Sequence, residues 1–160
     1  MSSQVLRGQS SAVRAFVALV RAHSAAIRQL NAQLARDHGL TINDYEVLLR
    51  LARAPDRRMR RVDLADEVLL TASGITRLLD GLEQAGFVER GSCESDRRVV
   101  YAVLTEAGFE KLHEASTTHV TQIEDLFSAR LDESEQATFA GLLERVAAED
   151  ADLDCAAPDA

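Results

Sequence analysis

The chain has 160 residues, of which 46% are hydrophobic and 28% charged, an ordinary composition for a globular domain with a modest core. No apolar run approaches the ~20 residues of a membrane-spanning helix, no secretory signal pattern opens the sequence, and two distant cysteines do not make a disulfide framework. We therefore expect a cytoplasmic protein without a membrane partner. Residues 1–149 should form one domain, and the small, acidic residues 150–160 a disordered tail.

Charge is unevenly distributed along the chain, whose net value is −8. Residues 1–49 hold five arginines and three acids, and residues 50–100 ten arginines and nine acids. Residues 101–160 hold three basic residues and fourteen acids, so all of the negative excess lies there. A polyanion can therefore meet the first two thirds of the chain. A solvated acidic helix face would explain the same gradient, which alone decides nothing.

Helical spacing of apolar residues dominates the first half. A long helix is predicted over 12–37, ended by His38-Gly39, and a second begins after a Thr41 cap and stops before Pro55. Residues 54–61 read as a basic connector. A short third helix and a fourth helix capped by Thr71 follow. The apolar residues that mark the first and third helices are Phe16, Val20, Ile27, Leu30, Leu34, Val62, Leu64, Ala65 and Val68. The residues expected to be buried in the second and fourth helices are Tyr45, Leu48, Leu49, Leu51, Ile75, Leu78, Leu79 and Leu82.

Two strands and two helices complete the chain. The strands are expected over 87–90 and 99–104, joined by a polar loop over 91–98. Thr105 should cap a long helix, and Asp132-x-x-Glu135 should open the last one. The inward residues of these helices are predicted to be Phe109, Leu112, Val120, Ile123, Leu126, Phe127, Phe139, Leu142, Leu143 and Val146. The fold class is thus mainly α (α+β).

Residues 62–86, VDLADEVLLTASGITRLLDGLEQAG, have the pattern of a helix-turn-helix. The buried positions of its second helix leave Ala72, Ser73, Thr76 and Arg77 on the other side, near the N-terminal half that enters a major groove in this motif. Hydroxyl and guanidinium groups suit phosphate oxygens and base edges. Any amphipathic helical hairpin can imitate this pattern, so the motif alone leaves DNA binding open.

The β-hairpin that follows has the position of a wing. In a strand, Asp96 and Arg98 point to the same side, so the carboxylate can orient the guanidinium. An arginine on a protruding loop suits the negative potential of a minor groove. Arg97 and Arg98 could also belong to an ordinary solvated turn, but the flanking pattern favours the wing.

Several short motifs together resemble the MarR family of dimeric winged helix-turn-helix regulators. They are Asp96-x-Arg98, Leu104-Thr105-x-x-Gly108, Leu64-Ala65, Thr76-Arg77 and Leu82-Glu83-x-x-Gly86, and the resemblance covers residues 12–147. It implies a winged helix-turn-helix over 41–104 with a two-stranded β-wing. It also implies N- and C-terminal dimerisation helices over 12–38 and 105–149.

The resemblance assigns the DNA contacts residue by residue. Ser73, Thr76 and Arg77 would face the major groove, and Arg98, supported by Asp96 and flanked by Arg97, would enter the minor groove. Family members often carry Ser or Thr before the third helix, where this chain has Arg60 and Arg61. We interpret this as a lost helix cap offset by phosphate contacts. Two interpretations fit the arginines at 57, 58, 60 and 61 equally well, a phosphate-contacting cluster and a merely soluble connector.

The family also implies an effector site between the dimer helices and the DNA-reading part, for small amphipathic molecules that are often aromatic acids. The candidate lining residues are Phe16, Val20, His23, Tyr45, Leu49 and His113. The same residues are equally plausible as core, and we favour core for most of them.

Other chemistries have weaker support. Cys93 suggests redox sensing, but the peroxide-sensing branch of the family carries its cysteine in the first helix, where this chain has none. Glu110, His113 and Glu114 share a helix face, yet Thr117 stands where a second histidine would complete a metal-binding pair, so we expect no metal and no cofactor. The sequence shows neither a glycine-rich phosphate loop nor a convincing nucleophile–base pair, so we do not expect an enzyme.

The sequence therefore predicts a homodimeric, ligand-responsive repressor that binds a pseudo-palindromic operator in double-stranded DNA. The alternative is a helical protein-interaction module that has the same fold and does not bind DNA. In that case the surface around Arg77 and Arg98 would not be basic, or would be occluded.

Overall fold

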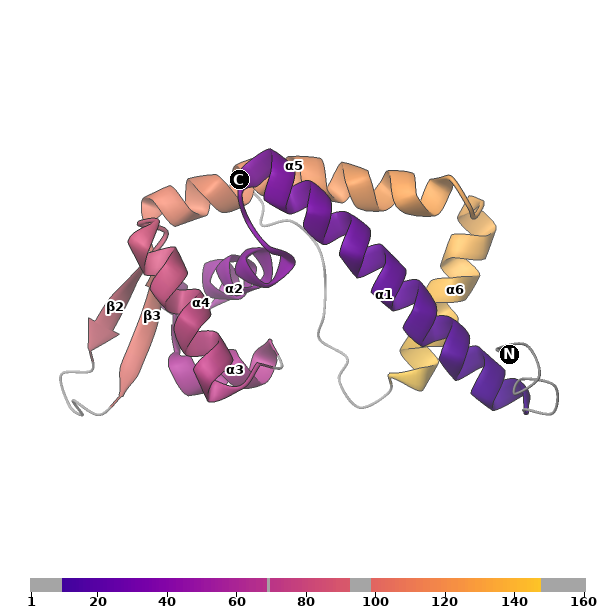
Figure 1. Cartoon of the computed structure of the whole chain (residues 1–160), viewed down its shortest axis with the longest axis horizontal. Helices are drawn as coiled ribbons and strands as arrows, with labels where there is room; N and C mark the ends of the chain where they lie inside the picture. The colour runs from indigo at the N-terminus through magenta and orange to yellow at the C-terminus, as the bar shows by residue number, and fades with distance from the viewer. Residues whose placement is uncertain (1–9, 69, 93–98, 148–160) are drawn as a thin grey trace, which may run out of the picture.

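The computed structural model describes residues 10–68, 70–92 and 99–147, which form helices around a small antiparallel sheet (Figure 1). The elements in chain order are α1 (Ser11–His38), α2 (Ile42–Arg53), the 3-10 turn η1 (Pro55–Arg57), β1 (Arg58–Arg60), α3 (Arg61–Glu67), α4 (Ala72–Gln84), β2 (Val88–Ser92), β3 (Val100–Leu104), α5 (Glu106–Ser128) and α6 (Glu133–Val146). We call residues 42–104 the lobe and helices α1, α5 and α6 the arm. The mainly α winged-helix fold class is confirmed.

Local capping sets the helix boundaries as the sequence predicts. Thr41 and Asp44 form a reciprocal capping box, in which the Thr41 N–H donates to Asp44 at 2.8 Å and the Asp44 N–H donates to the Thr41 hydroxyl at 3.1 Å. Asp132 and Glu135 form a second capping box at the start of α6. Gly39 ends α1 with φ +68°, a left-handed conformation that favours glycine.

The hydrophobic core lies in the lobe and where the arm meets it. Its fully buried residues come from the end of α1, from α2, α3 and α4, from the inner face of the sheet, and from the first half of α5. They are Leu34, Leu40, Val47, Leu48, Leu51, Leu64, Ala65, Ile75, Leu79, Leu82, Val88, Ala102, Leu104, Leu112 and Ala115. This core fixes the orientation of α4, because the inward side of α4 packs against α2, α3 and β2.

The sheet contains one strand more than expected. β1, which the sequence analysis treated as a connector, pairs antiparallel with β3, so the strand order is β1-β3-β2. Arg58–Arg60 has no strand-forming run; it is held as a strand by the free edge of β3 and by Met59, which packs against the core. β2 also runs on to Ser92, because Gly91 fits opposite Tyr101, where a Cβ would lie 2.9 Å from Val103.

The Leu-Thr-x-x-Gly motif joins the sheet to the arm. The Thr105 hydroxyl donates to the Gly86 carbonyl at 2.7 Å and accepts from the Gly108 N–H at 3.0 Å, so one side chain ties the end of α4 to the start of α5. A Cβ on Gly108 would lie 2.1 Å from the Phe87 carbonyl oxygen. Only glycine therefore allows α5 to start this close to the chain entering β2.

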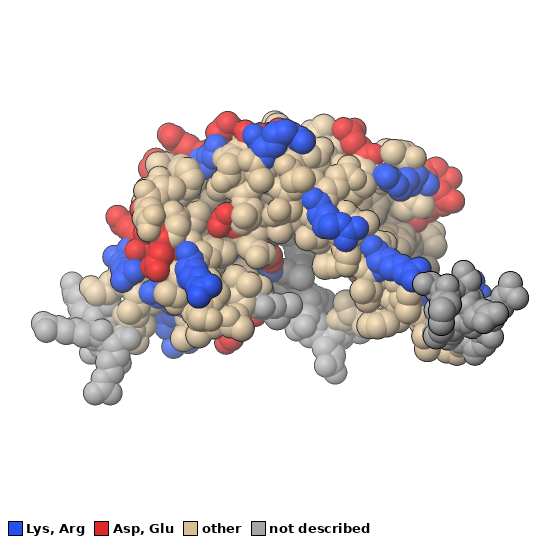
Figure 2. Space-filling model, viewed as in Figure 1, with Lys and Arg blue, Asp and Glu red and all other residues tan. Residues whose placement is uncertain are grey.

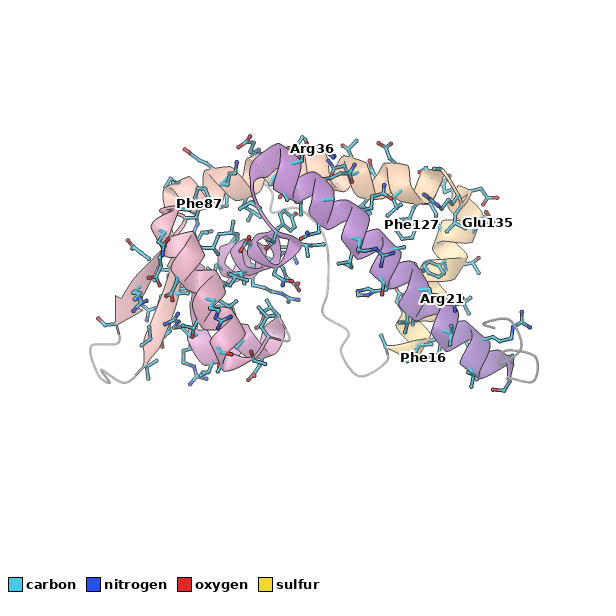
Figure 3. All side chains as sticks on the ribbon, in the orientation of Figure 1. Phe16, Arg21, Arg36, Phe87, Phe127 and Glu135 are labelled. Atoms are coloured by element: carbon cyan, nitrogen blue, oxygen red, sulfur yellow. The ribbon has the colours of Figure 1, made fainter. Side chains whose placement is uncertain are left out.

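The arm leaves apolar side chains uncovered, which corrects part of the sequence analysis. Phe16 is 66% exposed, Leu142 51% and Val146 78%, and Val20 and Val120 are exposed as well, although Val120, Leu142 and Val146 were expected to face inward. The physical reason is that α1 and α5 diverge from the lobe, and α6 buries no residue completely (Figure 1). Phe16 and Phe87 lie at opposite ends of the molecule (Figure 3).

Candidate nucleic-acid interface

Helix α4 presents the predicted recognition side chains to solvent. Ile75, Leu79 and Leu82 are buried, and on the other side Ala72, Ser73, Thr76 and Arg77 are all exposed. The hydroxyl of Thr71 accepts from the Gly74 N–H at 3.1 Å and caps the helix. The N-terminal half of α4 is therefore an open surface on a rigidly packed helix.

The polar groups on this surface are in different bonding states. The Thr76 hydroxyl donates to the Ala72 carbonyl at 2.8 Å, within the helix. The Ser73 hydroxyl lies 3.2 Å from that of Thr71. Arg77 has no charged or aromatic partner in the part of the chain that the structure describes. Its guanidinium is therefore available to an external acceptor.

Other arginines of the lobe are already engaged. Arg57 lies 3.0 Å from Glu106 and stacks on Phe109, with 4.0 Å between the guanidinium carbon and the ring centre. Arg58 stacks on Tyr101 at 4.4 Å. Arg50 lies 3.5 Å from Glu67 on the next helix. These three arginines thus each contact an acidic or aromatic side chain, whereas Arg77 contacts neither among the described residues.

Arg60 and Arg61, both predicted to contact phosphates, have intrachain partners. Arg60 donates twice to Asp63, at 2.6 and 2.7 Å, and these hydrogen bonds raise the pKa of Arg60. The Arg61 side chain is only 19% exposed, and its Nη2 lies 3.9 Å from Asp80. Arg60 caps α3 without a side-chain hydrogen bond, as the sequence analysis inferred. In this structure both cations are held by acids, so binding a phosphate would require each to share or leave its partner.

The base of the wing is attached to α4. Arg90 on β2 donates to Glu83 at 2.8 Å and to Asp80 at 2.9 Å, and both acids belong to α4. These hydrogen bonds raise the pKa of Arg90. β2 and β3 run beside α4 and form the left edge of the lobe in Figure 1. Cys93, Asp96, Arg97 and Arg98 lie outside the described residues, so their roles stay predictions.

Charge on the visible face is mixed. Acidic side chains are most frequent along the upper edge, over α5 and its junction with α6, where basic side chains lie among them (Figure 2). Other basic side chains lie along α1 and over the lobe, where acidic side chains are also present (Figure 2).

The six candidate effector-site residues are not gathered into one site within a single chain. Tyr45 and Leu49 pack against the core, whereas Phe16, Val20, His23 and His113 are exposed. The expectation that most of them are core residues is therefore wrong: Phe16, Val20 and His23 lie in the first half of α1, away from the core, and His113 is at an exposed position of α5. An open hollow of about 500 Å3 lies elsewhere, between α2, β1 and α3, and none of the six residues lines it.

Sequence reasoning missed a buried polar cluster where α1, α2 and α5 meet. His119 is 5% exposed, and its ring centre lies 4.7 Å from that of Tyr45. Burial, and secondly the neighbouring His38, lower the pKa of His119. The Tyr45 hydroxyl lies 3.1 Å from that of Ser116. The polar stretch around position 119 gave no sign of burial, because only the packing of α2 against α5 covers it.

Within residues 10–68, 70–92 and 99–147, no group of three or more His, Cys, Asp or Glu side chains is arranged to hold a metal ion. Within the same ranges, no helix combines the length and apolar character needed to cross a membrane.

Known proteins are similar to this chain in sequence and in fold. A family profile described as "MarR family" matches residues 38–99. The HTH-type transcriptional regulator MhqR of Bacillus subtilis (strain 168) is 30% identical over 134 residues, covering 84% of this chain and 90% of that protein. The relatives found are transcriptional regulators rather than enzymes.

Two solved structures from Streptomyces coelicolor superpose on most of the chain. AbsC, a MarR family transcriptional regulator, does so with a TM-score of 0.76 and 30% identity, over 88% of this chain and 95% of its own. Sco3205, another MarR family regulator, was crystallised in complex with DNA. It has the same TM-score of 0.76 and 30% identity, over 87% of this chain and 88% of its own.

Proposed function

This chain belongs to the MarR family of DNA-binding transcriptional regulators, and we propose that it acts as a homodimeric, ligand-responsive repressor. The operator would be a pseudo-palindrome in double-stranded DNA, because a two-fold dimer presents two α4 helices to half-sites about one helical turn apart. Its site of action would be the cytoplasm, with the DNA it regulates.

The observation that carries this proposal is the state of Arg77. It is exposed on the outer side of α4, next to Ser73 and Thr76, and lacks a charged or aromatic partner in the described part of the chain. An arginine fork of this kind suits the O6 and N7 acceptors of guanine in a major groove. Asp96, Arg97 and Arg98 would complete the interface by bringing the wing to the minor groove, and Arg60 and Arg61 would reach phosphates by sharing their acids.

The arm supports the dimer part of the proposal. Phe16, Val20, Leu142 and Val146 leave apolar area uncovered on helices outside the lobe. Burying apolar area is the main favourable term in most protein association, and a second copy of the chain would bury it. Residues 12–38 and 105–149 would then be the dimerisation helices, and residues 41–104 the DNA-reading part.

The effector would bind between the arm and the lobe of the dimer. We propose Phe16, Val20, His23, Tyr45, Leu49 and His113 as lining residues and a small amphipathic molecule, such as an aromatic acid, as the ligand. Such a ligand would act by changing the separation of the two α4 helices. It can shift that equilibrium only by its differential affinity for the two states.

Fluorescence anisotropy with the DNA upstream of the protein's own gene tests DNA recognition. Arg77→Ala should weaken binding by about 1–3 kcal/mol, the range for one good base contact. Arg36→Ala is the matched control: Arg36 is exposed on α1, far from the N-terminal half of α4, and should bind as the wild type does (Figure 3). Affinity should also fall steeply with salt. For each tenfold rise in salt concentration, the logarithm of the binding constant should fall by about 0.9 per neutralised phosphate.

Two results would contradict the proposal. If Arg77→Ala binds as tightly as the wild type, α4 does not read bases through this residue. If a scrambled duplex and every promoter fragment in a genome-wide selection bind equally weakly, the alternative gains ground, namely a helical interaction module with this fold. Arg77 is exposed and has no charged or aromatic partner among the residues that the structure describes, which favours the DNA-binding function.

A further inference from the structure

The exposed side of α4 carries two different rows of side chains. Residues four apart on a helix are neighbours, so Ala72 lies beside Thr76 in one row, and Ser73 lies beside Arg77 in the next. All four residues are exposed. The rows have different chemistry, because the second offers a hydroxyl and a guanidinium, whereas the first begins with a methyl group.

The intrahelical hydrogen bond of Thr76 decides what the first row offers. A threonine hydroxyl has a single hydrogen, and that of Thr76 is donated to the Ala72 carbonyl at 2.8 Å. The side chain therefore has no donor left for a base. Its γ-methyl and the methyl of Ala72 remain as two adjacent apolar groups on an otherwise polar surface.

We propose that the Ala72–Thr76 pair is a specificity determinant that selects a thymine in each half-site through its C5-methyl group. This inference rests on the proposed placement of α4 in the major groove. Among the four bases, only thymine presents an apolar group there, and alanine and threonine methyls are suited to contact it. Arg77, in the adjacent row, would meet a neighbouring base pair, so the two rows together would recognise two adjacent base pairs.

A competing chemistry uses the same side chain. The Thr76 oxygen keeps its lone pairs, so it can in principle accept from the N6 amine of adenine or the N4 amine of cytosine. The two readings require different atoms of Thr76, the methyl in one case and the oxygen in the other. They are separable, because Thr76→Ser removes only the methyl and Thr76→Val replaces only the hydroxyl. Position 76 is exposed, so neither change disturbs the core.

The experiment starts from a duplex that the protein itself selects. The wild-type protein is used to enrich binding sites from a random double-stranded library, and each thymine of the enriched half-site is then replaced singly by uracil, which lacks only the C5-methyl. At one thymine the replacement should weaken wild-type binding about three- to fivefold, the effect of one buried methyl group. Thr76→Val should keep this ratio between thymine and uracil, and Thr76→Ser should bring it close to one.

The outcomes separate the inference from the function beneath it. If the library yields no enriched sequence, the proposed sequence-specific function fails, and this inference fails with it. If a site is enriched but uracil is tolerated at every thymine, the function stands and the methyl contact is wrong. If Thr76→Ser keeps the thymine–uracil ratio, the discriminating methyl is not that of Thr76. A loss of affinity with Thr76→Val alone would assign the reading to the hydroxyl oxygen instead.

Discussion

The lobe and the arm of this molecule bury apolar side chains to different extents. In the lobe, Leu48, Leu51, Leu64 and Leu79 are all fully buried. In the arm, α6 has no fully buried residue, and Phe16 on α1 is 66% exposed. The core of the lobe, which Leu34, Leu112 and Ala115 of the arm complete, is thus closed within one chain, whereas the far part of the arm leaves apolar side chains exposed.

The largest expected effect tests this difference directly. Leu48→Ala should lower the free energy of unfolding by about 2–5 kcal/mol, because it leaves a cavity in a closed core. Phe16→Ala should cost the isolated chain less than about 0.5 kcal/mol, because its side chain is mostly in water. Urea unfolding over a range of protein concentrations measures both.

Concentration dependence identifies the origin of each effect. Leu48→Ala should lower the unfolding midpoint at every concentration. Phe16→Ala should chiefly flatten the rise of the midpoint with concentration that dimerisation produces. If the wild type shows no such rise, the arm is not a dimer interface under those conditions.

A medium-sized effect is expected where the two regions join. Gly108→Ala would place a Cβ 2.1 Å from the Phe87 carbonyl oxygen, so α5 or the chain before β2 must move. We expect a loss of about 1–3 kcal/mol in unfolding free energy, the usual range for overpacking. Gly81→Ala in α4 is the control, because a Cβ there meets nothing within 4 Å. It should gain about 0.5–1 kcal/mol from helix propensity. Equal losses in the two variants would contradict this account of the joint.

The smallest effect concerns pH at the buried cluster between the two regions. Burial lowers the pKa of His119, so the unfolded chain binds a proton there at a higher pH than the folded chain does. This contribution to stability is present above the unfolded value of about 6.5 and is lost as pH falls toward the lower folded value. Because only one proton is involved, this contribution to the unfolding free energy can change by at most about 1.4 kcal/mol per pH unit.

The variant His119→Gln isolates this term. Tyr45 and His38 lie beside the imidazole, and Glu114 lies 3.7 Å from His38; all three residues are unchanged in this variant. Between pH 7.5 and pH 5.5, the unfolding free energy of His119→Gln should fall less than that of the wild type. If both fall by the same amount, His119 is not protonated on unfolding in this range.

Local signals made much of the fold predictable. The caps at Thr41, Thr71, Thr105 and Asp132 each act within one helical turn, so sequence spacing identified them. Helical periodicity likewise predicted which residues of α4 are exposed, and the resemblance to a family assigned these residues to DNA contacts.

The missed features depend on partners distant in the sequence. β1 is a strand because β3 offers an edge, and His119 is buried because α2 covers it. The pairing of Arg61 with Asp80 joins α3 to α4. The exposure of Phe16 and Val146 was misjudged for a related reason: an apolar stripe indicates that a surface is covered, but not whether the cover belongs to the same chain.

The placement of α5 has a mechanical consequence. The helix has 23 residues and is therefore about 34 Å long. One end is fixed against Phe87 by Gly108 and Thr105, and the other carries α6 (Figure 1). If α5 tilts as a rigid rod about the end beside the sheet, a tilt of about 5° displaces its far end by about 3 Å. Arg90 on β2 donates to Glu83 and Asp80, so the base of the wing is joined to α4. In the proposed dimer, a small angular change of the arm would therefore alter the separation of the two α4 helices.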